Sequence, residues 1–310
     1  MGTAPVKNLE TPKHLLDSLG PCGYCLGMVK HTPNIVADSA GFSNVRGRGA
    51  AHNPANRFER LSLDVVGQDD APIDVVPEEL TDGRRVQTAV YEDHSKTVIN
   101  RVDSPDLPFN WTINPYRGCE HGCIYCYARP THETLGFGAG LDFESRIMAK
   151  FDAPKLLRKE LAKPSWKGEP IVMSGVTDPY QPIETRARIT RQILEVCLEA
   201  RQPISIVTKS RLILRDMDLL TELARHNAVH VAISVTTLDK NLAMKMEPRA
   251  SSPRDRLWAI QRLASAGIPV TVMVAPVIPA VTDREVPRIL KAAVDAGARA
   301  ANYIMLRLPH

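Results

Sequence analysis

Hydrophobic residues after position 100 fall into short apolar runs that alternate with amphipathic segments. A short apolar run predicts a buried strand, and apolar residues three and four positions apart predict a helix. Six strands are expected, at Trp111–Asn114, Ile171–Ser174, Ile204–Thr208, Val229–Val235, Val270–Ala275 and Ala301–Leu306. Five helices are expected between them, at Pro154–Ala162, Arg188–Ala200, Arg215–His226, Pro253–Ala266 and Asp283–Ala296.

This alternation predicts an α/β protein with parallel strands joined by right-handed crossovers. An open doubly wound sheet and part of a β/α barrel both satisfy the pattern. Gly267 and Gly297 stand just past two of the helices, where a left-handed cap belongs. Asp283 is expected to cap the start of the last helix.

The first 100 residues show little sustained apolar periodicity and contain half of the glycines. We therefore expect residues 1–100 to form an irregular, partly disordered extension, and residues 101–310 to form the main folded domain. The extension is slightly acidic and the rest of the chain is basic, so that the whole carries a net charge of +4. A basic stretch at Arg46–Glu59 is expected to be a flexible turn.

Composition indicates a globular protein, since 44% of residues are hydrophobic and 24% are charged. The most apolar stretch, Ile268–Val281, is interrupted by prolines and is too short for a membrane span. The first residues contain no apolar core of a secretory signal. We therefore expect a cytoplasmic protein. The excess of basic residues is modest and aromatic residues are few, so nucleic acid is only one candidate substrate.

Polar clusters follow five of the predicted strands, and ligands of parallel α/β folds gather at that end. The cluster after the first strand contains Cys119, Cys123 and Cys126 in the pattern CxxxCxxC. In a cytosolic chain, clustered cysteines indicate metal or redox chemistry. A zinc ion would need a fourth ligand, such as His121 or His132. A four-iron cluster would take the three thiolates and leave one iron without a protein ligand.

The CxxxCxxC loop, with Tyr125 before its last cysteine, resembles the radical S-adenosylmethionine (SAM) superfamily. The resemblance implies a partial (β/α)₆ barrel of TIM type. It implies that Cys119, Cys123 and Cys126 bind a [4Fe-4S] cluster, whose open iron chelates SAM. Reductive cleavage of SAM then yields a 5′-deoxyadenosyl radical that abstracts hydrogen from the substrate. An electron donor such as flavodoxin or ferredoxin is also implied.

A finer resemblance points to the spore photoproduct lyase and DNA repair photolyase-like branch. It rests on NPYRGCEHGCIYCYAR, SGVTDPYQPIE, VTKS and MEPRASSPRDRL. By this resemblance, Thr177, Lys209 and Ser234 contact the methionine or ribose part of SAM, with Lys209 on the carboxylate. Tyr125 is expected near the adenine.

The sequence also departs from that lyase. The lyase uses a cysteine near the second-strand loop as hydrogen donor, whereas Gly175 and Val176 stand here. Cys197 lies between apolar residues of a predicted helix and is expected to be a core thiol. The implied reaction is hydrogen abstraction from an unknown substrate; a photolyase-like lyase on nucleic acid and a structural zinc protein are the alternatives.

Several further residues remain open between structure and function. Asp178 and Glu184 are expected either to be turn residues or to contact cofactor or substrate. Glu247 and Arg249 are expected either to form an ion pair with each other or to bind substrate. Arg307 is a candidate anion contact. Cys22 and Cys25 form a CxxC that is either incidental or an accessory metal or redox site. Because the chain stops directly after its sixth predicted strand, we expect the natural protein to be longer.

Overall fold

The computed structural model describes residues 47–54, 56–58, 86–104 and 107–307. All of the described residues lie in one compact unit, within Phe42–His310. Cys22 and Cys25 lie outside the described residues, so the expectation for them stays a prediction. No helix in the described part is long and apolar enough to cross a membrane.

Within the described residues, the main sheet has seven strands in the order β10-β9-β8-β7-β6-β3-β2. All neighbours are parallel except β2 and β3, which are antiparallel. The strand bounds are β2 Ile99–Arg101, β3 Trp111–Ile113, β6 Ile171–Met173, β7 Ile204–Thr208, β8 Val229–Ser234, β9 Val270–Val277 and β10 Ala300–Met305. The six predicted strands are therefore confirmed, with shifts of one or two residues at their ends.

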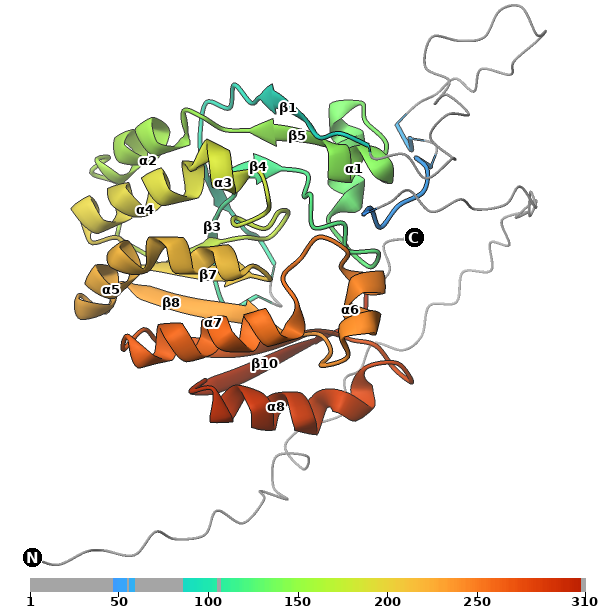
Figure 1. The fold of residues 1–310 in the computed structure, drawn as a ribbon. Coiled ribbons are helices and arrows are strands. Elements are labelled where there is room, and N and C mark those ends of the chain that lie inside the picture. Colours follow the sequence, from blue (N-terminus) through green and yellow to red (C-terminus); the bar gives the residue numbers. More distant parts are fainter. Residues whose placement is uncertain (1–46, 55, 59–85, 105–106, 308–310) are drawn as a thin grey trace, which may run out of the picture. The chain divides into compact units, whose positions relative to one another are not determined.

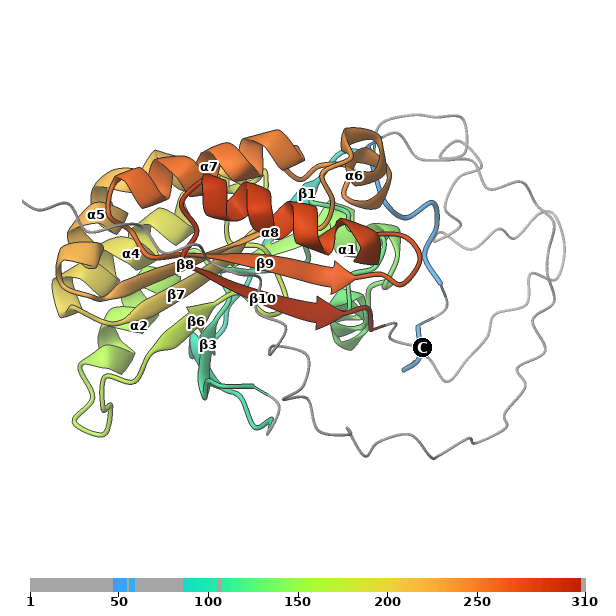
Figure 2. The same cartoon turned by 90° about the horizontal axis from the view of Figure 1, so that it is seen from below.

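The parallel strands follow one another in chain order, which distinguishes a partial barrel from a doubly wound sheet. With right-handed crossovers, this order places every connecting helix on the same face. Figures 1 and 2 show that face covered by helices. The helices are α2 Ala153–Leu161, α4 Ile189–Ala200, α5 Met217–Arg225, α7 Pro253–Ser265 and α8 Val286–Asp295. All five predicted helices are present.

Two of the three helix-end predictions are confirmed. Gly267 and Gly297 both have positive φ angles, +79° and +100°, and each directly follows the C-cap residue of its helix, α7 or α8. The prediction of a cap at Asp283 was wrong. Asp283 belongs to a short 3₁₀ helix, η5 (Asp283–Glu285), and α8 begins only at Val286, with no side-chain cap. Proline at the second position of α8 needs no N–H partner, which reduces the need for a cap.

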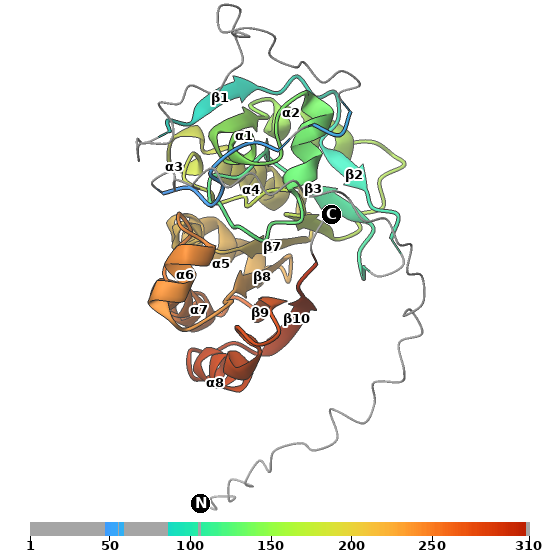
Figure 3. The same cartoon turned by 90° about the vertical axis from the view of Figure 1, so that its right-hand side faces the viewer.

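A second, smaller sheet contains β1 (Ala89–Glu92), β5 (Arg146–Ala149) and β4 (Tyr116–Arg117), in the order β1-β5-β4. Two short elements, η3 Arg129–Leu135 and α1 Leu141–Ser145, precede β5, and two more, α3 Glu184–Ala187 and η4 Arg211–Asp216, occur later in the chain. A helix that the sequence pattern did not predict, α6 (Lys240–Met246), is capped at its start by the carboxylate of Asp239. Figure 3 shows β1 and α1 beyond the β3 side of the main sheet.

The segment before residue 101 contributes to this architecture. β1 joins β5, and β2 joins β3 at the edge of the main sheet. The described part of the expected extension is therefore not uniformly irregular. The domain boundary after residue 100 stays a prediction.

Candidate functional site

The cysteine loop begins directly after β4 and is turned by a glycine. Gly118 has a φ of +78°, a backbone conformation that glycine adopts without strain. A side chain there would also collide with its surroundings, since a Cβ atom would lie 2.8 Å from the Phe143 carbonyl oxygen. The next residue, Cys119, donates its backbone N–H to that same oxygen over 2.9 Å. Gly118 therefore fixes the path by which the first cysteine enters the loop.

Cys119, Cys123 and Cys126 all lie in this loop as free thiols. Cys119 and Cys123 are buried, and Cys126 is partly buried. Burial raises the pKa of all three, and raises that of Cys123 to about 12. The thiols are close enough to interact, because Cys123 and Cys126 both raise the pKa of Cys119 further. Buried thiolates at this loop would therefore need a cationic partner.

The described residues include no group of three His, Cys, Asp or Glu side chains arranged around a single metal ion. Each of the two histidines considered as zinc ligands has one ring nitrogen with another partner. His121 Nδ1 lies 3.3 Å from Asp178 Oδ2, and His132 Nε2 lies 2.9 Å from the Arg146 carbonyl oxygen. A cluster with several irons has no such requirement, because each thiolate binds a different iron.

Arg129 and Glu144 hold the cysteine loop from the side of the small sheet. The Arg129 guanidinium donates to the Cys123 carbonyl oxygen over 2.8 Å and to the buried Glu144 carboxylate. Glu144 also accepts the backbone N–H groups of Gly49 (2.8 Å) and Ala50 (2.9 Å). The stretch expected to be a flexible turn is thus bonded, where described, to the support of the loop.

Thr177 and its neighbours hold the loop from the β6 side. The Thr177 hydroxyl donates to the Gly118 carbonyl oxygen over 2.6 Å and accepts from the Gln181 amide over 3.0 Å. The buried Asp178 carboxylate accepts from the Lys209 backbone N–H (2.8 Å) and the Thr208 hydroxyl (2.7 Å). Thr177 and Asp178 therefore connect the cysteine loop to the ends of β6 and β7.

Lys209 and Tyr125 lie together at the strand ends. The Lys209 ammonium is 5.8 Å from the centroid of the Tyr125 ring, within the range of a cation–π contact. Burial lowers the pKa of Lys209, but the negative charges of Cys123 and Glu247 outweigh it and raise the pKa overall. The ammonium thus faces the cysteine loop as a charged group.

Glu247 is the buried anion of this group. Its carboxylate accepts hydrogen bonds from the Tyr125 hydroxyl and the Thr236 hydroxyl, the latter over 2.7 Å, and pairs with the Arg256 guanidinium. Burial raises its pKa, but Arg256 and Lys209 lower it to about 2. The open alternative of a Glu247–Arg249 ion pair was wrong, because Arg249 pairs with Glu120 over 3.1 Å.

The remaining candidates differ in their positions. Ser234, the last residue of β8, is buried and donates its hydroxyl to the Ala275 carbonyl oxygen over 3.2 Å. Glu184 is buried and accepts from Tyr116 and Arg215, which makes it part of the scaffold. Cys197 is completely buried in α4, as expected for a core thiol. Arg307 is exposed after β10, and its role as an anion contact stays a prediction.

Sequence reasoning missed the residues that support the site. Glu144 belongs to no recognised motif, and Arg129 and Gln181, although they lie within NPYRGCEHGCIYCYAR and SGVTDPYQPIE, were given no role by the sequence. Their partners are up to 95 positions away in the chain, so periodicity gives no signal for them. Arg256 gave a weak signal, since it lies in MEPRASSPRDRL, one of the stretches that carried the family resemblance.

The sequence matches the Radical SAM superfamily over residues 113–293. An uncharacterized protein of Mycobacterium tuberculosis is 38% identical over 216 residues, which cover 69% of this chain and 64% of the relative. A Radical SAM Nalpha-GlyT isomerase of Pseudomonas phage M6 is 28% identical over 172 residues, covering 55% of this chain and 34% of the relative. The chain thus spans just under two thirds of the length of the mycobacterial relative.

A solved structure of spore photoproduct lyase with bound SAM and dinucleoside spore photoproduct has a similar fold. Its TM-score is 0.50 at 19% identity, covering 70% of this chain and 61% of the lyase chain. The matched residues 113–293 are more than half of the chain and include the cysteine loop, β6 to β9 and the helices between them. By this match, the chain belongs to the radical SAM superfamily.

Proposed function

We propose that this chain is a radical SAM enzyme in which Cys119, Cys123 and Cys126 bind a [4Fe-4S] cluster. The observation that carries the proposal is the position of three free thiols on one braced loop at the carboxyl ends of the parallel strands. When bound, the cluster and SAM supply one-electron cleavage of the sulfonium to a 5′-deoxyadenosyl radical, which abstracts hydrogen from the substrate.

The residues around the loop fit such a group. Iron–sulfur clusters favour thiolate ligands, and the hydrogen bonds around them tune their potential. Lys209 and Arg256 lower the pKa of Cys123 against the effect of burial, so the protein supplies positive charge at this thiol. Three cysteines without a protein-derived fourth ligand leave one iron open for SAM.

We assign the SAM contacts to Lys209, Tyr125, Ser234 and Thr177. Lys209 binds the methionine carboxylate as a point charge, and its contact with the Tyr125 ring orients the ammonium. Tyr125 is placed beside the adenine, with its hydroxyl held by Glu247. Ser234 supports the ribose or methionine end. The Thr177 hydroxyl already bonds Gly118 and Gln181, so its contribution is to position the loop as well as to approach SAM.

The proposed substrate is a molecule with an abstractable hydrogen. A photolyase-like repair reaction on nucleic acid is disfavoured by the β6 loop, where Gly175 and Val176 stand in place of a hydrogen-donating cysteine. The other described cysteine, Cys197, is completely buried in α4, so its thiol is closed to a substrate. A cytoplasmic location and a reductant of the flavodoxin or ferredoxin type complete the proposal.

The test is anaerobic reconstitution of the full chain with iron and sulfide. We expect about four irons per chain, as a [4Fe-4S] cluster requires, and release of 5′-deoxyadenosine from SAM after addition of dithionite. The Cys119→Ala/Cys123→Ala/Cys126→Ala variant should lose both the bound iron and the release of 5′-deoxyadenosine. The control is Cys197→Ala, which removes a thiol outside the loop and should keep both. Stoichiometric zinc without iron, or cleavage that survives the triple substitution, would overturn the proposal.

A further inference from the structure

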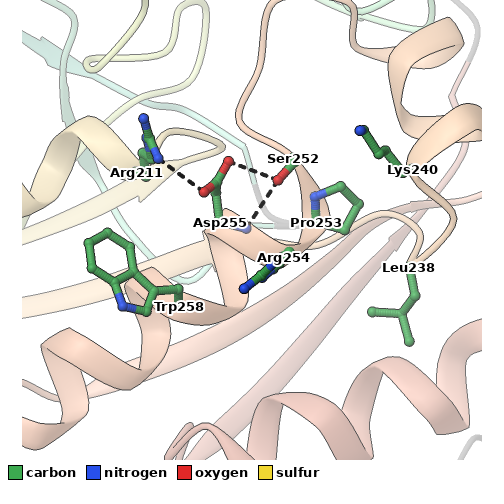
Figure 4. Close-up of a pocket in the computed structure, with 8 residues that line it drawn as sticks. All are labelled: Arg211, Leu238, Lys240, Ser252, Pro253, Arg254, Asp255 and Trp258. Carbon is green, nitrogen blue, oxygen red and sulfur yellow. Dashed lines mark hydrogen bonds and ion pairs between the residues drawn. The ribbon is translucent and has the colours of Figure 1, made fainter.

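A basic groove lies beside the cysteine loop. It consists of two hollows that share Arg211. The first is lined by Lys240 of α6 and by Arg254 and Trp258 of α7, as Figure 4 shows. The second is lined by Arg249 and by His121, which stands in the loop between Cys119 and Cys123. One end of the groove is therefore built by the cysteine loop itself.

The groove carries more positive charge than its acidic residues neutralise. Among the described residues that line the two hollows, Asp255 has the one carboxylate, and it pairs with Arg211 over 3.1 Å. Lys240 and Arg254 are exposed and form no ion pair with any described residue. Trp258, 46% exposed, adds an apolar contact surface. An acidic macromolecule would complement the positive charge of this groove, and an apolar side chain of it could pack on Trp258.

The groove is separated from the SAM residues by the first turn of α7. Residues two positions apart on a helix differ in direction by about 200°. Arg256 therefore projects to the other side of α7 from Arg254 and Trp258, and it is there that it pairs with the buried Glu247. A ligand in the first hollow therefore lies on the other side of α7 from Glu247 and the Tyr125 hydroxyl that it holds.

We propose that this basic groove docks the acidic protein that reduces the cluster. The inference rests on the proposed function, since it assumes a cluster at the three cysteines. The donor loses one electron and the cluster gains it; no bond forms or breaks and no proton is transferred. His121 links the groove to the loop, because it lines the second hollow and its carbonyl oxygen accepts the backbone N–H of Arg249 over 3.2 Å.

A protein donor fits these observations better than a nucleic-acid substrate. A substrate must reach the radical at the strand ends, and the first turn of α7 separates the groove from them. A donor needs only proximity to the cluster, and one wall of the groove is the loop that would hold it. Binding by charge is also suited to a partner that must dissociate after each electron transfer.

The test uses the reconstituted full chain and a purified acidic flavodoxin. The Lys240→Glu/Arg254→Glu variant reverses the two unpaired charges. We expect flavodoxin binding, measured by calorimetry at low salt, to weaken by about tenfold or more, as charge reversal in an interface implies. Binding to the unaltered chain should also weaken as salt rises. A matched control, Lys155→Glu/Lys159→Glu, reverses two charges at exposed positions of α2, outside the groove, and should bind as the unaltered chain does.

Cluster reduction separates the two proposals. In the groove variant, reduction by dithionite and the resulting SAM cleavage should persist, whereas reduction by flavodoxin should be lost. Equal flavodoxin affinity in the variant and the control would overturn the docking site. A groove variant that loses affinity for a single-stranded oligonucleotide but keeps its affinity for flavodoxin would overturn it as well. Failure of dithionite to support SAM cleavage in the unaltered chain would instead overturn the proposed function.

Discussion

The Tyr125 hydroxyl donates a hydrogen bond to the buried Glu247 carboxylate, and this contact joins the cysteine loop to the segment after α6. Arg256 neutralises Glu247 and also donates to the Ser234 carbonyl oxygen over 3.1 Å. The same segment meets the loop a second time, because the Ile124 N–H donates to the Met246 carbonyl oxygen over 3.0 Å. The Tyr125 ring, which faces Lys209, is thus held at its hydroxyl by Glu247 and at the neighbouring backbone by Met246.

Tyr125→Phe removes only the hydroxyl of this contact. Glu247 keeps Thr236 and Arg256, so we expect the free energy of unfolding to fall by no more than about 1–3 kcal/mol, as for a hydrogen bond to a charged group. Iron content should stay unchanged, while the KM for SAM rises several-fold because the ring is no longer fixed. Iron analysis and SAM-cleavage kinetics measure the two effects. Tyr127→Phe is the control; an equal KM rise there would contradict the assignment.

Lys209→Met removes the ammonium but keeps a side chain of similar length. If Lys209 binds the methionine carboxylate, SAM affinity should fall by about tenfold or more, the loss expected for a buried charge pair. Iron content should remain near that of the unaltered chain, because Lys209 is not a ligand. Equilibrium binding of SAM to the reconstituted protein measures the change. An unaltered affinity for SAM would contradict the assignment, and would mean that the Lys209 ammonium only balances the negative charge of the cysteine loop.

Gly118→Ala tests the entry to the cysteine loop. The new Cβ would lie 2.8 Å from the Phe143 carbonyl oxygen and 2.9 Å from His132 Cε1, and the residue would also keep a φ of +78°. We expect loss of iron binding and a fall in the free energy of unfolding of more than about 2 kcal/mol, since backbone strain adds to the collision.

Gly136→Ala is the matched control for this change. Gly136 has the same φ of +78° but open space around its Cβ position. It therefore carries the backbone strain alone, about 1–2 kcal/mol, and should leave iron binding intact. Equal effects of the two substitutions on iron content would show that the collision at Gly118 does not matter.

Regular elements were predictable because each is encoded in local sequence. The apolar runs of β7 to β9 and the amphipathic pattern of α7 gave their bounds to within two residues, and the cysteine spacing marked the loop. The supports of the loop were not predictable from periodicity. Glu144 bonds to Gly49 and Ala50, 95 and 94 positions away, and Arg256 reaches Glu247 across a turn. Such contacts depend on tertiary placement, which a local pattern does not encode.

Asp178→Asn tests the electrostatic link between β6, β7 and the loop. Burial raises the pKa of Asp178, but His121 and the hydrogen bonds from Lys209 and Thr208 lower it from 3.8 to about 2. A depressed pKa in the folded state stabilises the protein above the unfolded pKa, and this stabilisation disappears as the pH falls toward the folded pKa. The carboxylate should therefore contribute fully above about pH 4 and lose its contribution between about pH 4 and pH 2.

Urea unfolding of the cluster-free chain across this range measures the effect. At neutral pH, the new amide of the Asp178→Asn variant would turn an N–H toward a donor, so the variant should be less stable by about 1–3 kcal/mol. That difference should shrink as the pH falls below about 4, because the unaltered chain then loses its carboxylate charge. Asp218→Asn is the control: its pKa is also lowered by Arg191, but the side chain is 59% exposed, so the pair contributes little. A difference for Asp178→Asn that does not change with pH would rule out a charged Asp178 as the link, and would leave the hydrogen bonds that it accepts from Thr208, Lys209 and Tyr180.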